Sequence, residues 1–195
     1  MTIGLGKKAT PGLITETEPD VIVVATGSVP MIPDISGVER TSVVTAVDLL
    51  LAKIEPHEPI VVIGGGLIGC ETALHLAQKG SPVTIVEMLN HIAHDSPLPN
   101  QMHLRKLLAD AHVRILTKAN ASAIVDKGVL VCCGDAEGIF LEANSGVLAV
   151  GIKSDRELYK ALKNRFQSIY AVGDCVSPRK VLHAIWEAFR IALLI

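Results

Sequence analysis

The sequence predicts an α/β fold built around parallel strands, and three observations carry this prediction. Residues 21–25 and 60–63 are unbroken apolar runs, which are typical of strands covered on both faces. A helical pattern follows the second run, and another apolar run follows the helix, in the order of a βαβ unit. Hydrophobic residues make up 49% of the chain but aromatic residues only 3%, so the core must be aliphatic.

Length, charge and cysteine content exclude several classes of protein. The 195 residues suit one domain or two small ones, and a net charge of −2 does not provide the basic surface that nucleic-acid binding needs. No apolar helix reaches the roughly 20 residues of a membrane span. The four cysteines form no C-x-x-C pair and indicate reduced thiols. We therefore expect a cytoplasmic protein with neither nucleic acid nor membrane as a partner.

The first half of the chain alternates strands with helices. Glycine and proline mark where elements end, as at Gly80 and Pro82, where a helix stops. The expected elements are a strand at 21–25, an extended crossover at 28–38, a helix at 45–54, a strand at 60–63, a helix at 67–79 and a strand at 83–86.

The second half changes to a strand-like period. A helix over 104–111 and a third strand at 113–116 come first. Hairpin signals at 126–128, 134–138 and 144–146 then separate short strand-like runs, which predicts a β-meander as the third crossover. The runs are residues 123–125, 129–133, 139–141 and 147–150. A helix at 158–162, a strand at 168–172 and an apolar helix from 181 onward complete the chain.

A glycine pattern opens the helix that follows the strand at 60–63. In such a pattern the first glycine allows a tight turn, the second lets the backbone approach a pyrophosphate, and the third lets the helix pack on the strand. The pyrophosphate rests on the free N–H groups of the helix N-terminus. The predicted dinucleotide-binding segment is Gly64, Gly65, Gly66, Leu67, Ile68 and Gly69.

An acidic residue at the end of the next strand completes this fingerprint. Glu87 lies 18 residues after Gly69, near the position expected for the carboxylate that binds the ribose 2′-hydroxyl. A carboxylate repels the 2′-phosphate of NADPH, and residues 88–90 include no arginine to attract it. We expect a Rossmann-like domain that binds NADH; the alternative is that Glu87 merely ends a strand.

Three segments together resemble a flavoprotein family. They are PDVIVVATGSVP, IVVIGGGLIGCETALHLAQKG with VTIVE, and SIYAVGDCVSPRKVLHAIWEA. Over nearly its whole length the chain resembles the pyridine nucleotide–disulfide oxidoreductase type. Within it, the chain looks closest to the C-terminal region of the 2-enoate reductase and 2,4-dienoyl-CoA reductase (NADH:flavin oxidoreductase) family. VSPRKVLHAI and the absence of a C-x-x-x-x-C redox pair favour this branch over true disulfide reductases.

The resemblance implies an NAD-binding domain inserted between two remnants of an FAD-binding Rossmann-like domain. The expected limits are 1–40 and 155–195 for the FAD-domain remnants and 41–154 for the NAD-binding domain. The intact protein would pass a hydride from NADH to FAD and reduce an enoate or enoyl C=C bond. No catalytic acid or base is assigned, because the cofactors do the chemistry. The alternatives are an NADH oxidase, a ferredoxin reductase-like flavoprotein, or a non-catalytic nucleotide-binding module.

The resemblance also implies further cofactor-binding residues. In the NAD half, Glu71 would lie near the nicotinamide and Gly151 would line the cleft. Residues near FAD would be Thr26, Gly27, Gly173 and Asp174. The family's FAD half begins with its own glycine fingerprint, and this chain has only the one that serves NADH. FMN and an iron–sulfur cluster are expected only if the full-length enzyme has the upstream domain of that branch.

The chain's end suggests how it associates. The apolar run up to Ile195 carries no helix-stop signal, from which we expect a chain cut short, with an upstream flavin domain as its missing partner. Without that partner, an uncovered strand edge and an uncovered helix face should promote self-association. The residues of this apolar stripe are Leu182, Ile185, Trp186, Phe189 and Leu193.

Other reactive side chains are interpreted as structural. A loop with two histidines and an aspartate lacks a clear fourth ligand at zinc spacing, so no metal site is expected. Its residues are His91, His94 and Asp95, with His103 nearby. Cys132 and Cys133 are neighbours on a predicted strand, so their side chains point to opposite faces and should only pack.

Overall fold

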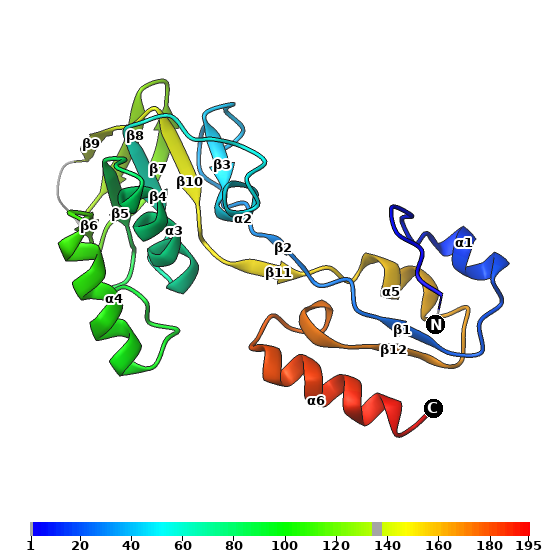
Figure 1. Cartoon of the computed structure of the whole chain (residues 1–195). Coiled ribbons are helices and arrows are strands. Elements are labelled where there is room, and N and C mark those ends of the chain that lie inside the picture. Colours follow the sequence, from blue (N-terminus) through cyan, green and yellow to red (C-terminus); the bar gives the residue numbers. More distant parts are fainter. Residues whose placement is uncertain (1, 134–137) are drawn as a thin grey trace. The chain divides into compact units, whose positions relative to one another are not determined.

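The computed structural model describes residues 2–133 and 138–195. The chain forms two compact units, drawn together in Figure 1. One unit comprises Pro30–Gly151, and the other comprises Met1–Val29 with Ile152–Ile195. The sequence placed these limits at 40 and 154. The larger unit begins at Pro30 and not after residue 40, because residues 30–40 bond to it: the Ile124 amide donates to the Ser36 carbonyl oxygen at 2.7 Å.

A parallel sheet of five strands forms the centre of the unit 30–151. Its order is β3 (Val43–Thr45), β10 (Ser145–Leu148), β4 (Ile60–Ile63), β5 (Val83–Val86) and β6 (Arg114–Leu116). All neighbouring strands run parallel. Every residue of β4 and β10 is buried, because the sheet is covered on both faces.

Helices cover one face of this sheet (Figure 1). They are α2 (Ala46–Leu50), α3 (Leu67–Gln78) and α4 (Leu98–Asp110). Because side chains alternate along a strand, Ile60 and Val62 of β4 pack with these helices, and Val61 and Ile63 pack on the opposite face. The aliphatic core predicted from composition is therefore divided between the two faces of one sheet.

A three-stranded antiparallel meander covers the opposite face. Its strands are β7 (Asn120–Val125), β8 (Gly128–Cys132) and β9 (Ile139–Glu142), in that order. The meander crossover predicted from the sequence is therefore present. The predicted fourth run is not part of it, because β10 enters the parallel sheet between β3 and β4. The signal at 144–146 is accordingly no hairpin turn, and Asn144 donates its amide to the Pro59 carbonyl oxygen at 2.8 Å. Most of the predicted turn at 134–138 lies outside the described residues.

The second unit is built around a parallel strand pair, β1 (Ile22–Val24) and β12 (Ile169–Ala171). Helix α5 (Glu157–Leu162) and helix α1 (Pro11–Glu16) accompany it, and its small core includes Ile22, Val24, Leu162 and Cys175. A 3₁₀ turn, η1 (Gly173–Cys175), connects β12 to helix α6 (Val181–Ala192). Two short connecting strands, β2 (Ser28–Pro30) and β11 (Ile152–Ser154), pair with each other.

Helix α1 was missed by the sequence analysis. Its start carries an ordinary local signal, because the Thr10 hydroxyl oxygen accepts from the Leu13 amide at 3.3 Å and Pro11 occupies the first helical position. The helix has only six residues and no buried side chain, so it offered no apolar periodicity to recognise.

The predicted apolar stripe of α6 is exposed. Trp186, its largest side chain, keeps 54% of its surface accessible, and no residue of the helix is buried. The sheet of β1 and β12 has two strands in the described part of the chain, so each strand has an unpaired edge there. None of the described helices is long and apolar enough to cross a membrane.

We predict that the chain self-associates through this stripe, because contiguous exposed apolar surface drives pairing between chains. Sedimentation velocity at micromolar concentrations should show dimers or larger species. Phe189→Glu should shift the population to monomer, whereas His183→Glu, which adds a charge to the same helix outside the stripe, should not. A wild-type chain that stays monomeric, with Trp186 shielded from soluble quenchers, would contradict this prediction.

Candidate functional site

The glycine turn between β4 and α3 depends on close backbone contacts. Gly64 has φ +105°, and a Cβ there would lie 2.5 Å from the Ala149 carbonyl oxygen. A Cβ on Gly69 would lie 2.0 Å from the Gly64 carbonyl oxygen, so only glycine lets α3 start this close to β4. At Gly66 the nearest atoms to a Cβ belong to the Asp95 carboxylate, at 3.7 Å and 3.8 Å. The Asp95 carboxylate therefore lies next to the turn, beside the first residues of α3.

Glu87 follows β5 directly and is 5% exposed. Its Oε2 accepts from the Gly65 amide at 2.5 Å, and its Oε1 accepts from the Leu89 amide at 2.7 Å. The side chain thus joins the glycine turn to the segment after β5. A carboxylate offers about four acceptor positions, so two remain for ligand hydroxyls. The two interpretations of Glu87 from the sequence, ribose binding and a structural role, are compatible in this geometry.

A cavity of about 740 Å³ lies at the carboxyl ends of β4, β5 and β10. Ligands of parallel α/β sheets bind at this end of the strands. Its charged lining residues are acidic, namely Asp34, Glu87 and Asp95, and His94 is the one ionisable base that lines it. The cavity therefore lies where parallel α/β sheets bind ligands, but its lining supplies little positive charge.

The structure brings together most of the residues predicted for the NAD half. The lining includes Gly64, Gly66, Leu67, Ile68, Glu87 and Gly151. Gly65 and Gly69 are buried in the turn behind this surface. Glu71 is exposed on α3 and does not line the cavity, and its place beside the nicotinamide stays a prediction.

The sequence analysis interpreted Asp95 as structural and did not connect it with the glycine turn. Its Oδ1 accepts from the Leu67 amide at 2.9 Å. The two residues are 28 positions apart, so no local pattern joins them. Among the described residues, no group of three His, Cys, Asp or Glu side chains is arranged to hold a metal ion.

The second unit contains an open cavity of about 490 Å³ where β12 ends. Gly27, Gly173 and Asp174 line it, and the first turn of α6 reaches it at Val181. Asp174 accepts from the Ser28 hydroxyl at 3.5 Å and from the Arg179 amide at 3.2 Å. Thr26 lies beside the cavity and donates its hydroxyl to the Asp155 carbonyl oxygen at 2.6 Å. The four residues predicted near FAD therefore lie on neighbouring segments of one unit.

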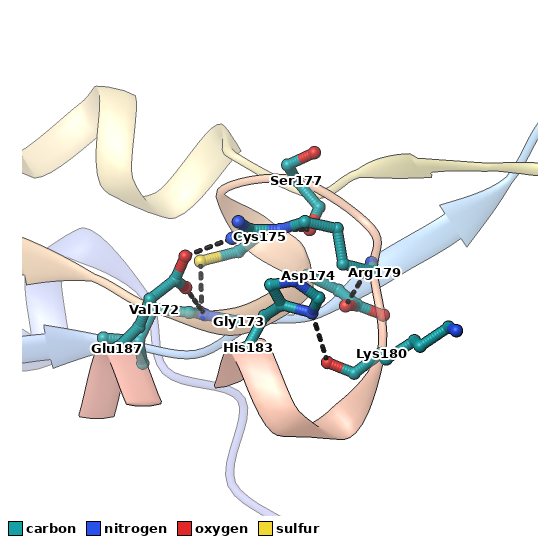
Figure 2. A network of polar contacts seen from close by, with 9 residues as sticks. All are labelled: Val172, Gly173, Asp174, Cys175, Ser177, Arg179, Lys180, His183 and Glu187. Atoms are coloured by element: carbon teal, nitrogen blue, oxygen red, sulfur yellow. Dashed lines mark hydrogen bonds and ion pairs between the residues drawn. The ribbon is translucent and has the colours of Figure 1, made fainter. Parts of the chain in front are cut away.

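Figure 2 shows the network that shapes this turn. Glu187 of α6 accepts from the Gly173 amide at 2.8 Å and forms an ion pair with Arg179. These two donors hold the pKa of the Glu187 carboxyl below its ordinary value, the Gly173 hydrogen bond contributing most. Glu187 therefore stays ionised, and it fixes the glycine whose φ of +72° sets the turn.

The cysteines are free thiols with different surroundings. Cys70, in the first turns of α3, is buried, and burial raises its pKa to about 12. Cys175 is buried and donates to the Val172 and Val24 carbonyl oxygens at 3.1 Å and 3.2 Å. Cys132 is exposed at the end of β8. The Cys70 thiol therefore lacks the ionised character that a redox cysteine requires.

Comparison with known proteins gives this geometry its context. Residues 6–188 match the family described as pyridine nucleotide-disulphide oxidoreductase. The chain belongs to this family. The family resemblance inferred from three sequence segments, and the Rossmann-like fold that it implies, are therefore confirmed.

Two curated relatives and one solved structure show which members of the family this chain is similar to. An NADH oxidase of Thermoanaerobacter brockii is 35% identical over 192 residues, which is 96% of this chain and 30% of that protein. A cinnamate reductase of Clostridium sporogenes is 34% identical over 193 residues, which is 97% of this chain and 29% of that protein. A 2-naphthoyl-CoA reductase in complex with 2-naphthoyl-CoA superposes with a TM-score of 0.92 at 32% identity, covering 98% of this chain and 29% of that one. The chain thus spans about a third or less of each relative's length.

We predict that Cys70 resists alkylation in the folded protein. With a pKa of about 12, only about one thiol in ten thousand is ionised at pH 8. Mass spectrometry of peptides after iodoacetamide treatment should show Cys132 modified and Cys70 unmodified, and both modified in denaturant. Alkylation of Cys70 as fast as Cys132 in the folded protein would contradict the burial seen here.

Proposed function

We propose that this chain is the NADH-binding portion of an NADH-dependent flavin oxidoreductase, together with part of its FAD-binding portion. The observation that carries the proposal is the cavity at the ends of β4, β5 and β10, where the glycine turn and Glu87 meet. When bound, NADH would supply a hydride, and FAD of the intact protein would accept it. The matched family and the NADH oxidase relative support this class of reaction.

The residues of the unit 30–151 fit a dinucleotide. Gly64 and Gly69 bring the N-terminus of α3 to the cavity, so its amides can donate to a pyrophosphate. Glu87 retains acceptor capacity for a ribose hydroxyl. Gly151 and the segment after β10 close another side of the cavity. These contacts bind and orient a cofactor, which is the role left to protein in cofactor chemistry.

The residues of the other unit fit only part of an FAD molecule. Asp174 is placed to bond hydroxyls of the ribityl region, with Gly27 and Gly173 beside it. No second glycine fingerprint opening a helix occurs in the sequence, so the FAD pyrophosphate has no comparable site on this chain. We therefore assign FAD to the intact protein and derive no step from its contacts here. FMN and an iron–sulfur cluster are proposed only if the full-length enzyme has the upstream domain of that branch.

We propose an enoate or enoyl thioester as the final acceptor. The relatives named cinnamate reductase and 2-naphthoyl-CoA reductase support a conjugated substrate of this kind. The NADH oxidase relative favours oxygen as the second candidate acceptor. Free cysteines fit a reducing compartment, and we propose the cytoplasm. A flavin spectrum of the intact protein separates both candidates from a non-catalytic nucleotide-binding module.

We predict that the chain binds NADH more tightly than NADPH. Glu87→Gln should narrow the difference by roughly tenfold, because hydrogen bonds to a charged group contribute about 1.5–3 kcal/mol and the repulsion of a 2′-phosphate disappears. Calorimetric titration with both cofactors measures this. Glu87→Ala should weaken both cofactors, since the Gly65 and Leu89 amides lose their acceptor.

Glu142→Gln is the matched control, because Glu142 is exposed on β9 and does not line the cavity. Equal affinity of the wild-type chain for the two cofactors, or a preference for NADPH, would refute the role of Glu87. Absence of any NADH binding would refute the proposed function itself.

We predict that the purified chain is colourless or carries FAD well below one molecule per chain. Asp174 alone cannot replace a helix N-terminus for the pyrophosphate. Visible absorbance per chain measures the content, and Asp174→Asn should remove any residual flavin while Asp20→Asn, an exposed acid of the same unit, should not. A yellow preparation with one FAD per chain would show that this prediction is wrong.

A further inference from the structure

The N-terminus of α3 already has an anionic partner. Asp95 Oδ1 accepts from the amide of Leu67, the first residue of the helix, at 2.9 Å. Both residues line the cavity of the unit 30–151. A carboxylate at this position satisfies a free amide and interacts favourably with the helix dipole. It occupies the place where a bound pyrophosphate would receive the same hydrogen bond.

The loop that carries Asp95 is fixed to the glycine turn. The Ala93 amide donates to the Gly65 carbonyl oxygen at 2.7 Å, and buried Ile92 lies where a side chain on Gly65 would stand. Gln101 donates to the Ser96 carbonyl oxygen at 2.7 Å from the next helix. The residues before and after Asp95 in the loop are therefore anchored by hydrogen bonds, whereas the Asp95 side chain is exposed.

The acidic lining of the cavity also disfavours the entry of a further anion beside Asp95. Its lining carries three carboxylates, and of these Asp95 is the one that accepts a hydrogen bond from the first residue of α3. Glu87 is held by two backbone amides behind the turn. A dianionic pyrophosphate entering this cavity meets negative charge with His94 as the one nearby base of the lining. The Leu67 amide has one hydrogen to donate, so Asp95 and a pyrophosphate would compete for the same hydrogen bond.

We infer that Asp95 is an internal competitor for the pyrophosphate site and limits the affinity for the dinucleotide. Binding of NADH breaks the bond from Leu67 to Asp95 and moves the carboxylate out of the first turn of α3. The inference rests on the proposed NADH site and adds to it a residue that sets affinity. The hydrogen bond from Leu67 to Asp95 then stabilises the chain without NADH and is absent from the chain with NADH bound.

The test compares NADH affinity in variants of the full chain by calorimetry. Asp95→Ala should tighten NADH binding by about threefold to thirtyfold, the range expected for loss of a competing helix cap. Asp95→Asn, which keeps an oxygen acceptor without the charge, should fall between Asp95→Ala and wild type. Asp34→Asn is the matched control: it removes a charge from the same cavity without touching α3 and should tighten binding less.

A second measurement needs no ligand. Hydrogen exchange at the Leu67 amide should be slow in the free wild-type chain and faster in Asp95→Ala, and thermal unfolding should move to lower temperature. Equal exchange in the two chains would overturn the inference, and so would unchanged or weaker NADH binding by Asp95→Ala, or an equal gain from Asp34→Asn. If neither wild type nor any variant binds NADH although Leu67 is protected by Asp95, the proposed function fails, and the competitor role fails with it.

Discussion

The contact between the start of α3 and the end of β4 is the constraint on which the larger unit depends. A Cβ at Gly69 would lie 2.0 Å from the Gly64 carbonyl oxygen, so any side chain there would push the helix off the strand. The close approach aims the free amides of α3 at the carboxyl end of the sheet, where the strands on either side also end. The cavity lies where these ends meet at one level, and the N-terminus of α3 adds the positive end of a helix dipole to it.

The five-stranded sheet supports this arrangement by being covered on both faces. Alternate residues of β4 belong to different cores, one with the helices and one with the meander. On the helical face, α3 is the helix that begins beside Gly64 at the cavity. The free amides of its first turn therefore lie on one side of the cavity.

Local patterns in the sequence were enough for the parallel strands, the glycine turn, Glu87 and the exposed stripe of α6. Each depends on residues within one element or two adjacent ones. The features that were missed depend on contacts distant in sequence. The Asn144-Ser145-Gly146 signal resembles a hairpin turn, but the pairing of β10 with β3 and β4 decides where that segment goes. Asp95 reaches Leu67 across 28 residues, and residues 30–40 join the larger unit through Ile124.

Both units use a carboxylate to hold a glycine amide at the end of a parallel strand. Glu87 does this for Gly65, and Glu187 does it for Gly173. An unpaired backbone amide in a partly buried turn costs free energy, so each turn acquires its acceptor from the protein itself. The two sites differ in how the charge is balanced. Arg179 pairs with Glu187, whereas none of the residues lining the larger cavity is an arginine or lysine. The lining of the larger cavity is therefore acidic without a lysine or arginine in it, and under the proposed competition the exposed carboxylate of Asp95 is the group that an incoming phosphate displaces.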